Sequence, residues 1–567
     1  MVRVQSLLLL AAALCCTACG ARPNAGETPA DLVVYGRVWT GDSSKPWAQA
    51  VAVSGDTIVA VGDSARLAQM VGQGTRVIAN GKAMVVPGFM DGHTHFLRGG
   101  FQLTNVDLRD AASPREFVAR IKAFAAKLRP GEWILGGMWD HESWPQAPLP
   151  DRSWIDSVTP NNPVFVGRLD GHMALANSAA LRKAGITRSI REIPGGAIVR
   201  RTDGELTGVL KDEALAPVLR VIPHPSESRS DAALARAMDW AASKGVTAVA
   251  DVDVPWVDAP WYEVAALRRA HAAGRLITRV SVYVPLRDWR RMADTVRMHG
   301  IGDQWLRLAG VKGYVDGSLG STTALFYRPY NDSPGTSGLL VIPEDSLRAW
   351  IGGADSAGLQ VAVHAIGERA NGLLLDIFDS VAKAHGSRDR RFRIEHAQHL
   401  RRGDIARLAR SGVIASMQPY HAIDDGRWAE ERIGPDRIKT TYAFRSLLDD
   451  GAHLGFGSDW NFGPIDPLLG IYAAVTRRTL DGKNPNGWVP EEKITVEEAL
   501  RAYTTGNAYG VFAERTRGKL VSGYQADLVM LDRDLTAISP DEIQRAGVRA
   551  TVIGGKAVFT APPTSDR

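Results

Sequence analysis

Eight short apolar runs between residues 84 and 457 constrain the fold of this chain more than any other feature. Stretches with a helical pattern of apolar residues separate them, and this alternation is typical of βα units that build a parallel sheet. The sequence therefore predicts an α/β protein with a (β/α)8 TIM barrel. The predicted barrel strands are residues 84–91, 246–252, 278–285, 307–315, 359–363, 392–394, 413–417 and 453–457.

Both ends of the chain, outside a barrel domain at residues 87–510, have the pattern of short β-strands separated by turn signals. Each set is too small to bury a core of its own, so residues 31–86 and 511–562 are expected to pair with each other. The predicted terminal strands are residues 32–39, 50–53, 57–61, 76–78, 523–531 and 548–559.

A long insertion, about residues 98–245, separates the first two predicted barrel strands and is rich in tryptophan and glycine. Segments that extend from the catalytic end of a barrel tend to cover the site, so we predict a lid or a substrate-binding subdomain. An alternative for Trp139 and Trp144 is that they fill a small core of this subdomain.

Residues 1–19 are predicted to be a lipoprotein signal peptide, followed by a flexible tether at residues 20–30. Arg3 precedes an apolar core that is far shorter than the ~20 residues of a membrane-spanning helix. The segment ends in Cys16-Thr-Ala-Cys19, which resembles a bacterial lipobox, with a plain secretory signal as the alternative. We therefore expect an exported protein on the periplasmic side of a bacterial membrane, anchored by a lipid at Cys19.

Cysteine usage and charge exclude several classes of function. All three cysteines lie in the predicted signal peptide, so the mature chain has neither a disulfide nor a cysteine nucleophile. The 67 basic and 62 acidic residues leave a formal charge of only +5, without a basic run interleaved with aromatic residues. Nucleic acid is therefore not expected as a partner, and a small-molecule substrate is. The sequence leaves homo-oligomer formation open.

Several predicted barrel strands end in residue types that bind metal ions. His93 and His95 follow the first strand at positions i and i+2, a spacing that points both imidazoles to the same side of an extended chain. His364, His396 and Asp459 end the fifth, sixth and eighth strands. Catalytic groups of a barrel lie at the carboxyl ends of its strands, so these side chains should meet. Neutral imidazoles and a carboxylate suit a divalent metal, above all Zn²⁺.

Five motifs carry a resemblance to a known family. They are residues 87–95, 311–321, 363–367, 395–397 and 457–459. This set of His-x-His, Lys, His, His and Asp resembles the amidohydrolase superfamily, and the surrounding sequence is similar to its amidohydrolase-3 branch, which includes N-substituted formamide deformylase-like proteins. The resemblance covers nearly the whole mature chain. It implies that the two chain ends build one composite β-sandwich beside the barrel.

The resemblance also implies which residues hold the metal. In superfamily members with a lysine at the fourth strand, that lysine carries a carbamate (N6-carboxylysine) that bridges two ions. The state of Lys312 therefore determines whether the site holds one ion or two. A protonated lysine cannot ligate a metal, whereas a desolvated amine loses its proton more readily and can capture carbon dioxide. A structural Lys312 paired with Asp316 is the alternative. The implied ligands are His93, His95, Lys312, His364, His396 and Asp459.

Asp459 is also the predicted general base. A metal lowers the pKa of bound water toward ~7, and a carboxylate that touches this water can take its proton and return it to the leaving nitrogen. A helix N-cap is the alternative role for Asp459. His172, His421 and Trp139 are predicted to contact substrate, with a structural role as the alternative for each. The branch usually has an arginine at the position of Thr322, which suggests a different substrate here.

These features predict a metal-dependent hydrolase that cleaves a non-peptide carbon–nitrogen bond, amide-like in character, of a small molecule. An ester or lactone hydrolase is one alternative, because the same activated water attacks any activated carbonyl. A noncatalytic cell-surface binding protein on the barrel scaffold is another. That alternative predicts the loss of a ligand or of the general base, whereas this sequence retains all of them.

Overall fold

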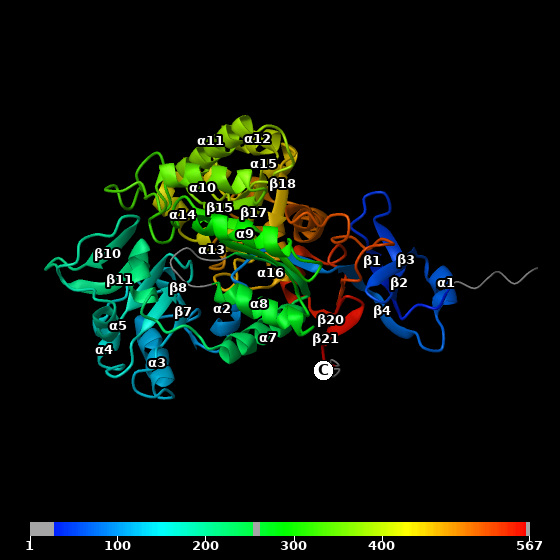
Figure 1. Ribbon diagram of the computed structural model, residues 1–567, viewed down its shortest axis with the longest axis horizontal. Coiled ribbons are helices and arrows are strands. Elements are labelled where there is room, and N and C mark those ends of the chain that lie inside the picture. Colours follow the sequence, from blue (N-terminus) through cyan, green and yellow to red (C-terminus); the bar gives the residue numbers. More distant parts are fainter. Residues whose placement is uncertain (1–27, 253–260, 563–567) are drawn as a thin grey trace, which may run out of the picture.

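The structure, a computed structural model, describes residues 28–252 and 261–562 and divides into three parts (Figure 1). A barrel lies in the centre, a sheet built from both chain ends lies on one side, and the insertion lies on the opposite side. The predicted signal peptide, with its lipid anchor at Cys19, falls outside the described residues and stays a prediction. Within the described ranges, no helix has both the length and the apolar character needed to span a membrane.

The barrel is a nearly closed sheet of eight parallel strands that follow one another in chain order. A parallel bridge between Thr94 and Trp460 joins the last strand to the first, and the backbone N–H of Asp459 donates to the carbonyl of His93 at 2.8 Å. The strands are β5 (Phe89–Thr94), β12 (Val246–Val252), β13 (Arg279–Pro285), β14 (Leu306–Tyr314), β15 (Gln360–Ala365), β16 (Arg393–His396), β17 (Ile414–Met417) and β18 (His453–Phe456).

Amphipathic helices surround the barrel and bury their apolar faces against it. The longest, α11 (Glu368–His385), buries Leu374, Phe378 and Val381, which the helical period places on one face. The other surrounding helices are α2 (Phe96–Gln102), α7 (Glu227–Ser243), α8 (Tyr262–Ala272), α9 (Trp289–His299), α10 (Glu344–Ser356), α12 (Arg402–Ser411), α13 (Pro419–Asp425), α14 (Ala429–Arg437), α15 (Phe444–Asp449), α16 (Pro467–Thr476), α17 (Val496–Arg501) and α18 (Asn507–Gly510).

The predicted first barrel strand, residues 84–91, is in fact divided between two sheets. Its first half ends β4 (Arg76–Pro87) of the terminal sheet, and the barrel strand begins only at Phe89. The chain crosses between the sheets at Gly88, where a Cβ atom would lie 2.3 Å from Oγ1 of Thr247. Only glycine allows this close approach, so the apolar run is interrupted although its hydrophobicity is continuous.

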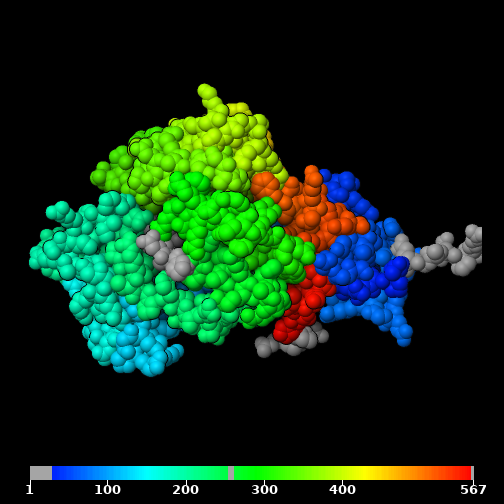
Figure 2. Space-filling model, viewed as in Figure 1, coloured from blue at the N-terminus to red at the C-terminus, as the bar shows by residue number. Residues whose placement is uncertain are grey.

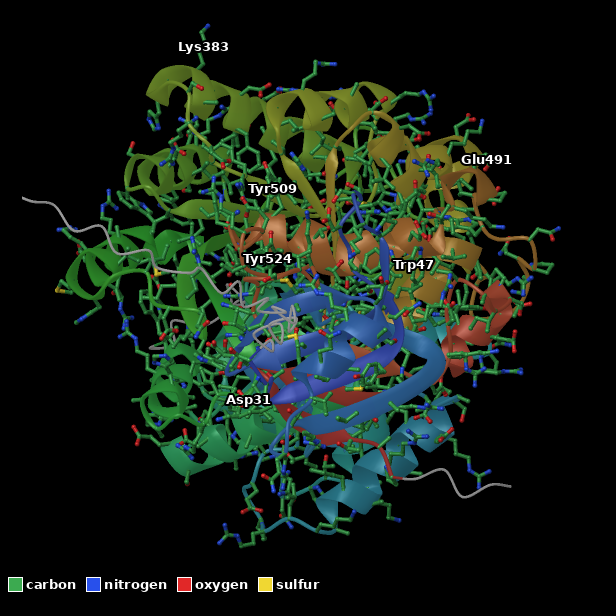
Figure 3. All side chains as sticks on the ribbon, turned by 90° about the vertical axis from the view of Figure 1, so that its right-hand side faces the viewer. Asp31, Trp47, Lys383, Glu491, Tyr509 and Tyr524 are labelled. Atoms are coloured by element: carbon green, nitrogen blue, oxygen red, sulfur yellow. The ribbon has the colours of Figure 1, made fainter. Side chains whose placement is uncertain are left out.

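The two chain ends pair through β4 and β19, as predicted, and the described strands are hydrogen-bonded in one seven-stranded order; the division into the two facing sheets of a sandwich stays a prediction. The side chains of Val34, Val51, Leu528 and Val552 belong to one apolar cluster of this sheet. Figure 3 shows the molecule with this sheet facing the viewer. The order is β21-β20-β19-β4-β1-β2-β3, with β1 (Leu32–Trp39), β2 (Trp47–Ser54), β3 (Thr57–Gly62), β19 (Leu528–Leu531), β20 (Val548–Ile553) and β21 (Lys556–Thr560).

The insertion forms a lobe of its own beside the barrel (Figure 2). Its six-stranded sheet covers a separate apolar core that includes Phe117, Ile121 and Val166. The last part of the predicted insertion, α7, packs instead against α2, α8 and β12 of the barrel. The elements of the lobe are β6 (Val106–Asp107), α3 (Pro114–Ala125), β7 (Gly136–Trp139), α4 (Ser153–Asp156), β8 (Phe165–Arg168), β9 (Met173–Ala176), α5 (Ser178–Lys183), β10 (Gly196–Arg200), β11 (Leu206–Asp212) and α6 (Ala216–Leu219).

Candidate metal centre

The carboxyl ends of the barrel strands bring the predicted ligands together in one cavity of about 50 Å³, which we call the metal cavity. Each of these side chains is almost completely buried. They come from β5 and the residue after it, from the adjacent strands β14, β15 and β16, and from the turn after β18, which barrel closure brings next to β5. The side chains are those of His93, His95, Lys312, His364, His396 and Asp459.

The spacing of the nitrogen and oxygen atoms in this cavity fits a shared ion. One ligand atom each from His93, His396 and Asp459 lie within 4.8 Å of one another. Oδ1 of Asp459 lies 3.1 Å from Nε2 of His95 and 3.5 Å from Nε2 of His93. Atoms that bind one tetrahedral Zn²⁺ at about 2.0–2.2 Å lie roughly 3.3 Å from each other. The donor set and its spacing therefore suit a divalent metal ion.

The protonation states of these groups also favour metal binding. Burial lowers the pKa of His95 from 6.5 to about 4 and also lowers the pKa of His93. Burial likewise holds the pKa values of His364 and His396 well below the usual range. Neutral imidazole is the form that ligates metals. Burial alone would raise the pKa of Asp459, but the neighbouring imidazoles, His93 foremost, hold it well below 3.8, so the carboxylate is ionised.

Polar neighbours fix the orientation of the imidazoles from behind. Nδ1 of His93 lies 2.6 Å from Oε2 of Glu395, which also accepts a hydrogen bond from Arg393; Nε of Arg393 lies 2.7 Å from Oε1. Nδ1 of His396 lies 2.8 Å from Oε1 of Gln418. In each case the Nδ1–H donates away from the cavity, so Nε2 presents its lone pair to the centre. The sequence interpretation missed these roles, although Glu395 directly precedes His396.

Lys312 and His364 occupy the side of the metal cavity nearest β14 and β15. Nζ of Lys312 lies 3.5 Å from Nε2 of His93, inside the set of predicted ligands. Nε2 of His364 faces the carbonyl of Gly317 at 3.0 Å, so this ring nitrogen already has a partner. The carboxylate of Asp316 accepts three backbone N–H groups at 2.7 to 3.0 Å, so its oxygens are largely occupied by the backbone.

Asp459 has a geometry that differs from a helix cap. The next helix, α16, is capped instead by Asp466, whose Oδ1 accepts the backbone N–H of Leu468 at 3.1 Å. The φ angle of Asp459 is 56°, in the left-handed region that non-glycine residues rarely adopt. This backbone conformation turns the carboxylate toward the imidazoles at the sharp bend after β18.

The three residues predicted to contact substrate have different positions. His172 and His421 both line the metal cavity. Nδ1 of His172 lies 2.6 Å from Oδ1 of Asp212, and the His172 ring lies 4.9 Å from that of His364. Trp139, in contrast, is fully buried in the core of the insertion, where Nε1 donates to the carbonyl of Val166 at 2.9 Å. Trp139 therefore has the structural role, because the sheet of the insertion turns it away from the cavity.

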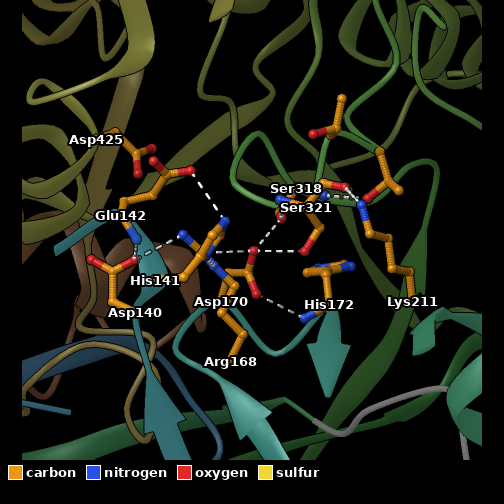
Figure 4. A network of polar contacts seen from close by, with 12 residues as sticks. Asp140, His141, Glu142, Arg168, Asp170, His172, Lys211, Ser318, Ser321 and Asp425 are labelled. Atoms are coloured by element: carbon orange, nitrogen blue, oxygen red, sulfur yellow. Dashed lines mark hydrogen bonds and ion pairs between the residues drawn. The ribbon is translucent and has the colours of Figure 1, made fainter. Parts of the chain in front are cut away.

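One wall of the metal cavity is a chain of buried charges that sequence reasoning missed (Figure 4). Arg168 pairs with Asp170 at 2.9 Å and with Asp140 at 3.1 Å. Asp170 also accepts hydrogen bonds from the hydroxyls of Ser318 and Ser321, so the insertion is held to the loop after β14. Arg168, a charged residue at the end of the apolar strand β8, was the sequence signal from which this wall could have been predicted.

Thr322, the position at which the branch usually has an arginine, lies outside the metal cavity. Its Oγ1 accepts a hydrogen bond from Nη1 of Arg432 at 3.0 Å, and Arg432 also pairs with Asp332 and Glu142. A guanidinium group from α14 thus reaches the loop after β14, and it ties that loop to the insertion.

A parallel barrel with imidazoles and a carboxylate at the ends of its strands defines the class of metal-dependent hydrolases built on this fold. The model of the Amidohydrolase family matches residues 76–559. The chain belongs to the amidohydrolase family, in its amidohydrolase-3 branch, and is a metal-dependent hydrolase of that superfamily.

Relatives and solved structures align along nearly the whole chain. It is 39% identical over 551 residues to the Protein LONG AFTER FAR-RED 3 of Arabidopsis thaliana, covering 95% of this chain and 93% of that protein. It is 28% identical over 543 residues to the N-substituted formamide deformylase of Arthrobacter pascens, with 92% and 97% covered. The crystal structure of an uncharacterized metal-dependent hydrolase from Pyrococcus horikoshii superposes with a TM-score of 0.72 at 29% identity, covering 90% of this chain and 99% of that one.

Proposed function

We propose that the protein hydrolyses a non-peptide carbon–nitrogen bond of a small amide, with Asp459 as the group that moves the proton. The ionised carboxylate of Asp459, placed 3.1 and 3.5 Å from two imidazole nitrogens at the floor of the metal cavity, carries this proposal. Similarity to an N-substituted formamide deformylase over 97% of that protein supports a carbon–nitrogen bond rather than an ester.

The floor of the metal cavity, formed by His93, His95, His364, His396 and Asp459, would hold a divalent ion. Zn²⁺ suits this mixture of imidazole and carboxylate groups best. The fit rests on the neutral, inward-facing imidazoles and on Oδ1 of Asp459, which is buried and has no well-oriented hydrogen bond to a described residue. When bound, the ion would acidify water and polarise a carbonyl group. His93, His95, His364, His396 and Asp459 are the protein ligands of this proposal, with Lys312 between them.

The side chains around the ion have separable tasks. Asp459, which is ionised and lies beside the imidazoles, accepts a proton from the attacking water and then donates it to the leaving nitrogen. His172, fixed through Nδ1 by Asp212, presents its other ring nitrogen to the cavity and orients the substrate. The small volume of the metal cavity admits the scissile group and excludes bulk water.

Substitution of Asp459 tests the proton-transfer role. We expect Asp459→Asn, assayed with saturating Zn²⁺ on a panel of N-substituted formamides, to lose at least about 1000-fold in kcat/KM. Asp450→Asn, which changes an exposed carboxylate before β18, at the opposite end of the strand from Asp459, is the matched control and should retain full activity. Undiminished hydrolysis by Asp459→Asn would contradict the proton-transfer role of Asp459. If the wild type hydrolysed formate esters with the same substituents but not the amides, the protein would be an ester hydrolase instead.

The number of ions tests the role of Lys312. We propose a carbamate on Lys312 that bridges two ions, because its Nζ lies 3.5 Å from Nε2 of His93. Metal analysis of the purified protein should then give about two ions per chain, and Lys312→Ala should retain at most one and lose hydrolysis. One ion per chain in both proteins, with activity unchanged, would make Lys312 a structural residue.

A further inference from the structure

A second, larger cavity adjoins the metal cavity. It has a volume of about 240 Å³, against about 50 Å³ for the metal cavity, and it lies between the sheet of the insertion and the barrel. The two cavities share three lining residues, Arg168, Gly171 and Phe462. Since the metal cavity has room for little more than the scissile group, the rest of a substrate must lie elsewhere, and the side cavity is its direct neighbour across these three residues.

The side cavity has an apolar interior. Its walls include the side chains of Phe101, Leu135, Met138, Phe165, Leu215 and Leu219. An apolar cavity of about 150 Å³ is enough to hold benzene, so this one has room for an aromatic ring and several further atoms. Contact with such walls favours an apolar group over a polar one by removing its surface from water.

The charged side chains among the described lining residues of the side cavity all have one sign. Its described lining includes Arg98 and Arg229 but no carboxylate. Neither guanidinium group has an ion-pair partner among the described residues, whereas Arg168, between the cavities, is neutralised by Asp140 and Asp170. A negative charge at the far end of an apolar group is therefore favoured there, and a positive charge is not.

The boundary between the cavities is held in place by specific contacts. The ring of Phe462 packs edge-on against the ring of His95, with centroids 4.9 Å apart. Gly171 lies so close to this ring that a Cβ atom would come within 2.4 Å of it. Arg109 donates to the carbonyls of Asn461 and Phe462, both at 2.7 Å, and so fixes the loop that carries the ring.

One buried polar atom near this boundary has no hydrogen-bond partner among the described residues. Asn461 lines the side cavity, its Nδ2 contacts only the sulfur of Met138 at 3.4 Å, and its Oδ1 has no hydrogen bond to a described residue. A buried amide oxygen without a partner is costly unless a ligand supplies the donor. The N–H of an amide that enters from the metal cavity is such a donor.

We propose that the side cavity is the binding site for an apolar, aromatic-sized group of the substrate that ends in a negative charge. The substrate class is thus a small amide whose reacting group sits in the metal cavity and whose apolar arm passes Phe462 toward Arg98. This inference rests on the proposed metal site and takes the amide from the proposed function, whereas the binding of the apolar arm does not depend on which bond is cleaved.

Gly167 offers a way to fill the side cavity without disturbing the metal cavity. It lies on β8 two residues after Phe165, on the same face of the strand, and both line the cavity. A Cβ atom at Gly167 would have only the carbonyl oxygen of Gly136 within 4 Å, at 3.8 Å, so a leucine side chain can extend into the space. Gly352→Leu on α10, where a Cβ also meets nothing within 4 Å, is the matched control.

The test is the binding of hydroxamates to the Zn²⁺-loaded protein, measured by calorimetry, which needs no turnover. The probes are acetohydroxamate, phenylacetohydroxamate, and its para-carboxylate and para-aminomethyl derivatives. We expect the phenyl group to lower Kd at least tenfold and the carboxylate to lower it further, while the ammonium group raises it. Gly167→Leu should abolish the gain from the phenyl group and leave the Kd of acetohydroxamate unchanged, which shows an intact metal site. Arg98→Gln should remove only the gain from the carboxylate.

Equal effects of Gly167→Leu and Gly352→Leu, or tightest binding of the ammonium derivative, would overturn the proposal. Failure of the proposed reaction is seen separately, because it would abolish amide hydrolysis while leaving this pattern of hydroxamate binding intact. Conversely, the protein could hydrolyse amides regardless of the size of their substituent and bind all the hydroxamates with the same Kd. That result would support the proposed reaction and contradict the role of the side cavity.

Discussion

The floor and the insertion-facing wall of the metal cavity differ in how their side chains are held. On the floor, each of His93 and His396 is neutral and is oriented by one contact behind the ring. On the wall, Arg168 and Asp170 are buried ions that stabilise each other across the boundary between insertion and barrel. The floor therefore depends on a bound ion for its function, whereas the wall is complete without one.

This difference suggests that the floor is responsible for the chemical step and the wall for substrate selection. The floor comes from the ends of barrel strands, which are rigid and fixed relative to one another, as a metal site needs. The wall comes from a lobe with its own core, whose contacts with the barrel include buried ion pairs and hydrogen bonds. Changes on the floor should therefore remove reactivity, and changes in the wall should alter stability and substrate choice.

The largest effect is expected on the floor, from His396→Ala. This substitution removes a ligand atom that lies within 4.8 Å of those of His93 and Asp459. Metal content should fall below about a tenth of that of the wild type, and hydrolysis at limiting metal should fall at least about 1000-fold. Elemental analysis and kcat/KM measure both. His385→Ala, a partly exposed histidine on α11, is the control, and full metal content in His396→Ala would remove this residue from the floor.

The next largest effect is expected in the wall, from Arg168→Met. The side chain is 2% exposed, and its loss leaves Asp170 and Asp140 with fewer compensating charges. We expect a loss of about 3 kcal/mol in the free energy of unfolding of the insertion, the low end for a broken buried pair, because Arg427 still pairs with Asp140. Hydrogen exchange of peptides from β7 and β8 measures it. The exposed Arg188→Met should change little, and a similar small change in Arg168→Met would contradict the comparison.

The same contrast explains what the sequence could predict. The barrel strands and the floor follow from local patterns, because an apolar run fixes a strand and the residue just after it lies at the carboxyl end. His364 and His396 were found in this way. The wall depends on pairs such as Arg168 with Asp140, which lie on different strands of the insertion, and no local pattern specifies that contact.

The errors have the same physical origin. The run of residues 84–91 is continuously apolar, but Gly88 approaches Thr247 so closely that the chain passes from one sheet to another there. The side of the insertion sheet on which Trp139 lies is likewise set by packing against Phe117 rather than by residue type. Where long-range packing decides, a motif alone does not give the environment of a side chain.

A smaller effect on the floor is expected from Glu395→Gln. The carboxylate accepts from Nδ1 of His93 at 2.6 Å, and Arg393 neutralises it. Replacing the charge by an amide weakens this support and leaves Arg393 buried without a counter-charge, so the Kd for Zn²⁺ should rise about 10- to 100-fold. Competition with a chelator measures the change. The exposed Glu491→Gln is the control, and an unchanged Kd would show that Glu395 does not position His93.

The smallest effect is expected in the wall and depends on pH. Burial, followed by the positive charge of Arg168, lowers the pKa of His141 from 6.5 to about 3. The unfolded chain therefore binds a proton at this position below pH 6.5, and the folded chain does not until much lower pH. Because the folded pKa is depressed, the stability that neutral His141 contributes is present above pH 6.5 and is lost as the pH falls.

His141→Asn isolates this contribution, since asparagine does not titrate and its carbonyl can still accept from Nε of Arg168, which lies 3.3 Å from Nδ1 of His141. Between pH 7.5 and pH 5.5 the wild type should lose about 1 kcal/mol of unfolding free energy relative to the variant. Paired denaturant titrations of the metal-free proteins measure the difference, which cancels the titration of all other groups. A difference that stays constant with pH would mean that His141 binds a proton to the same extent in the folded and the unfolded chain, so that burial in the wall does not lower its pKa.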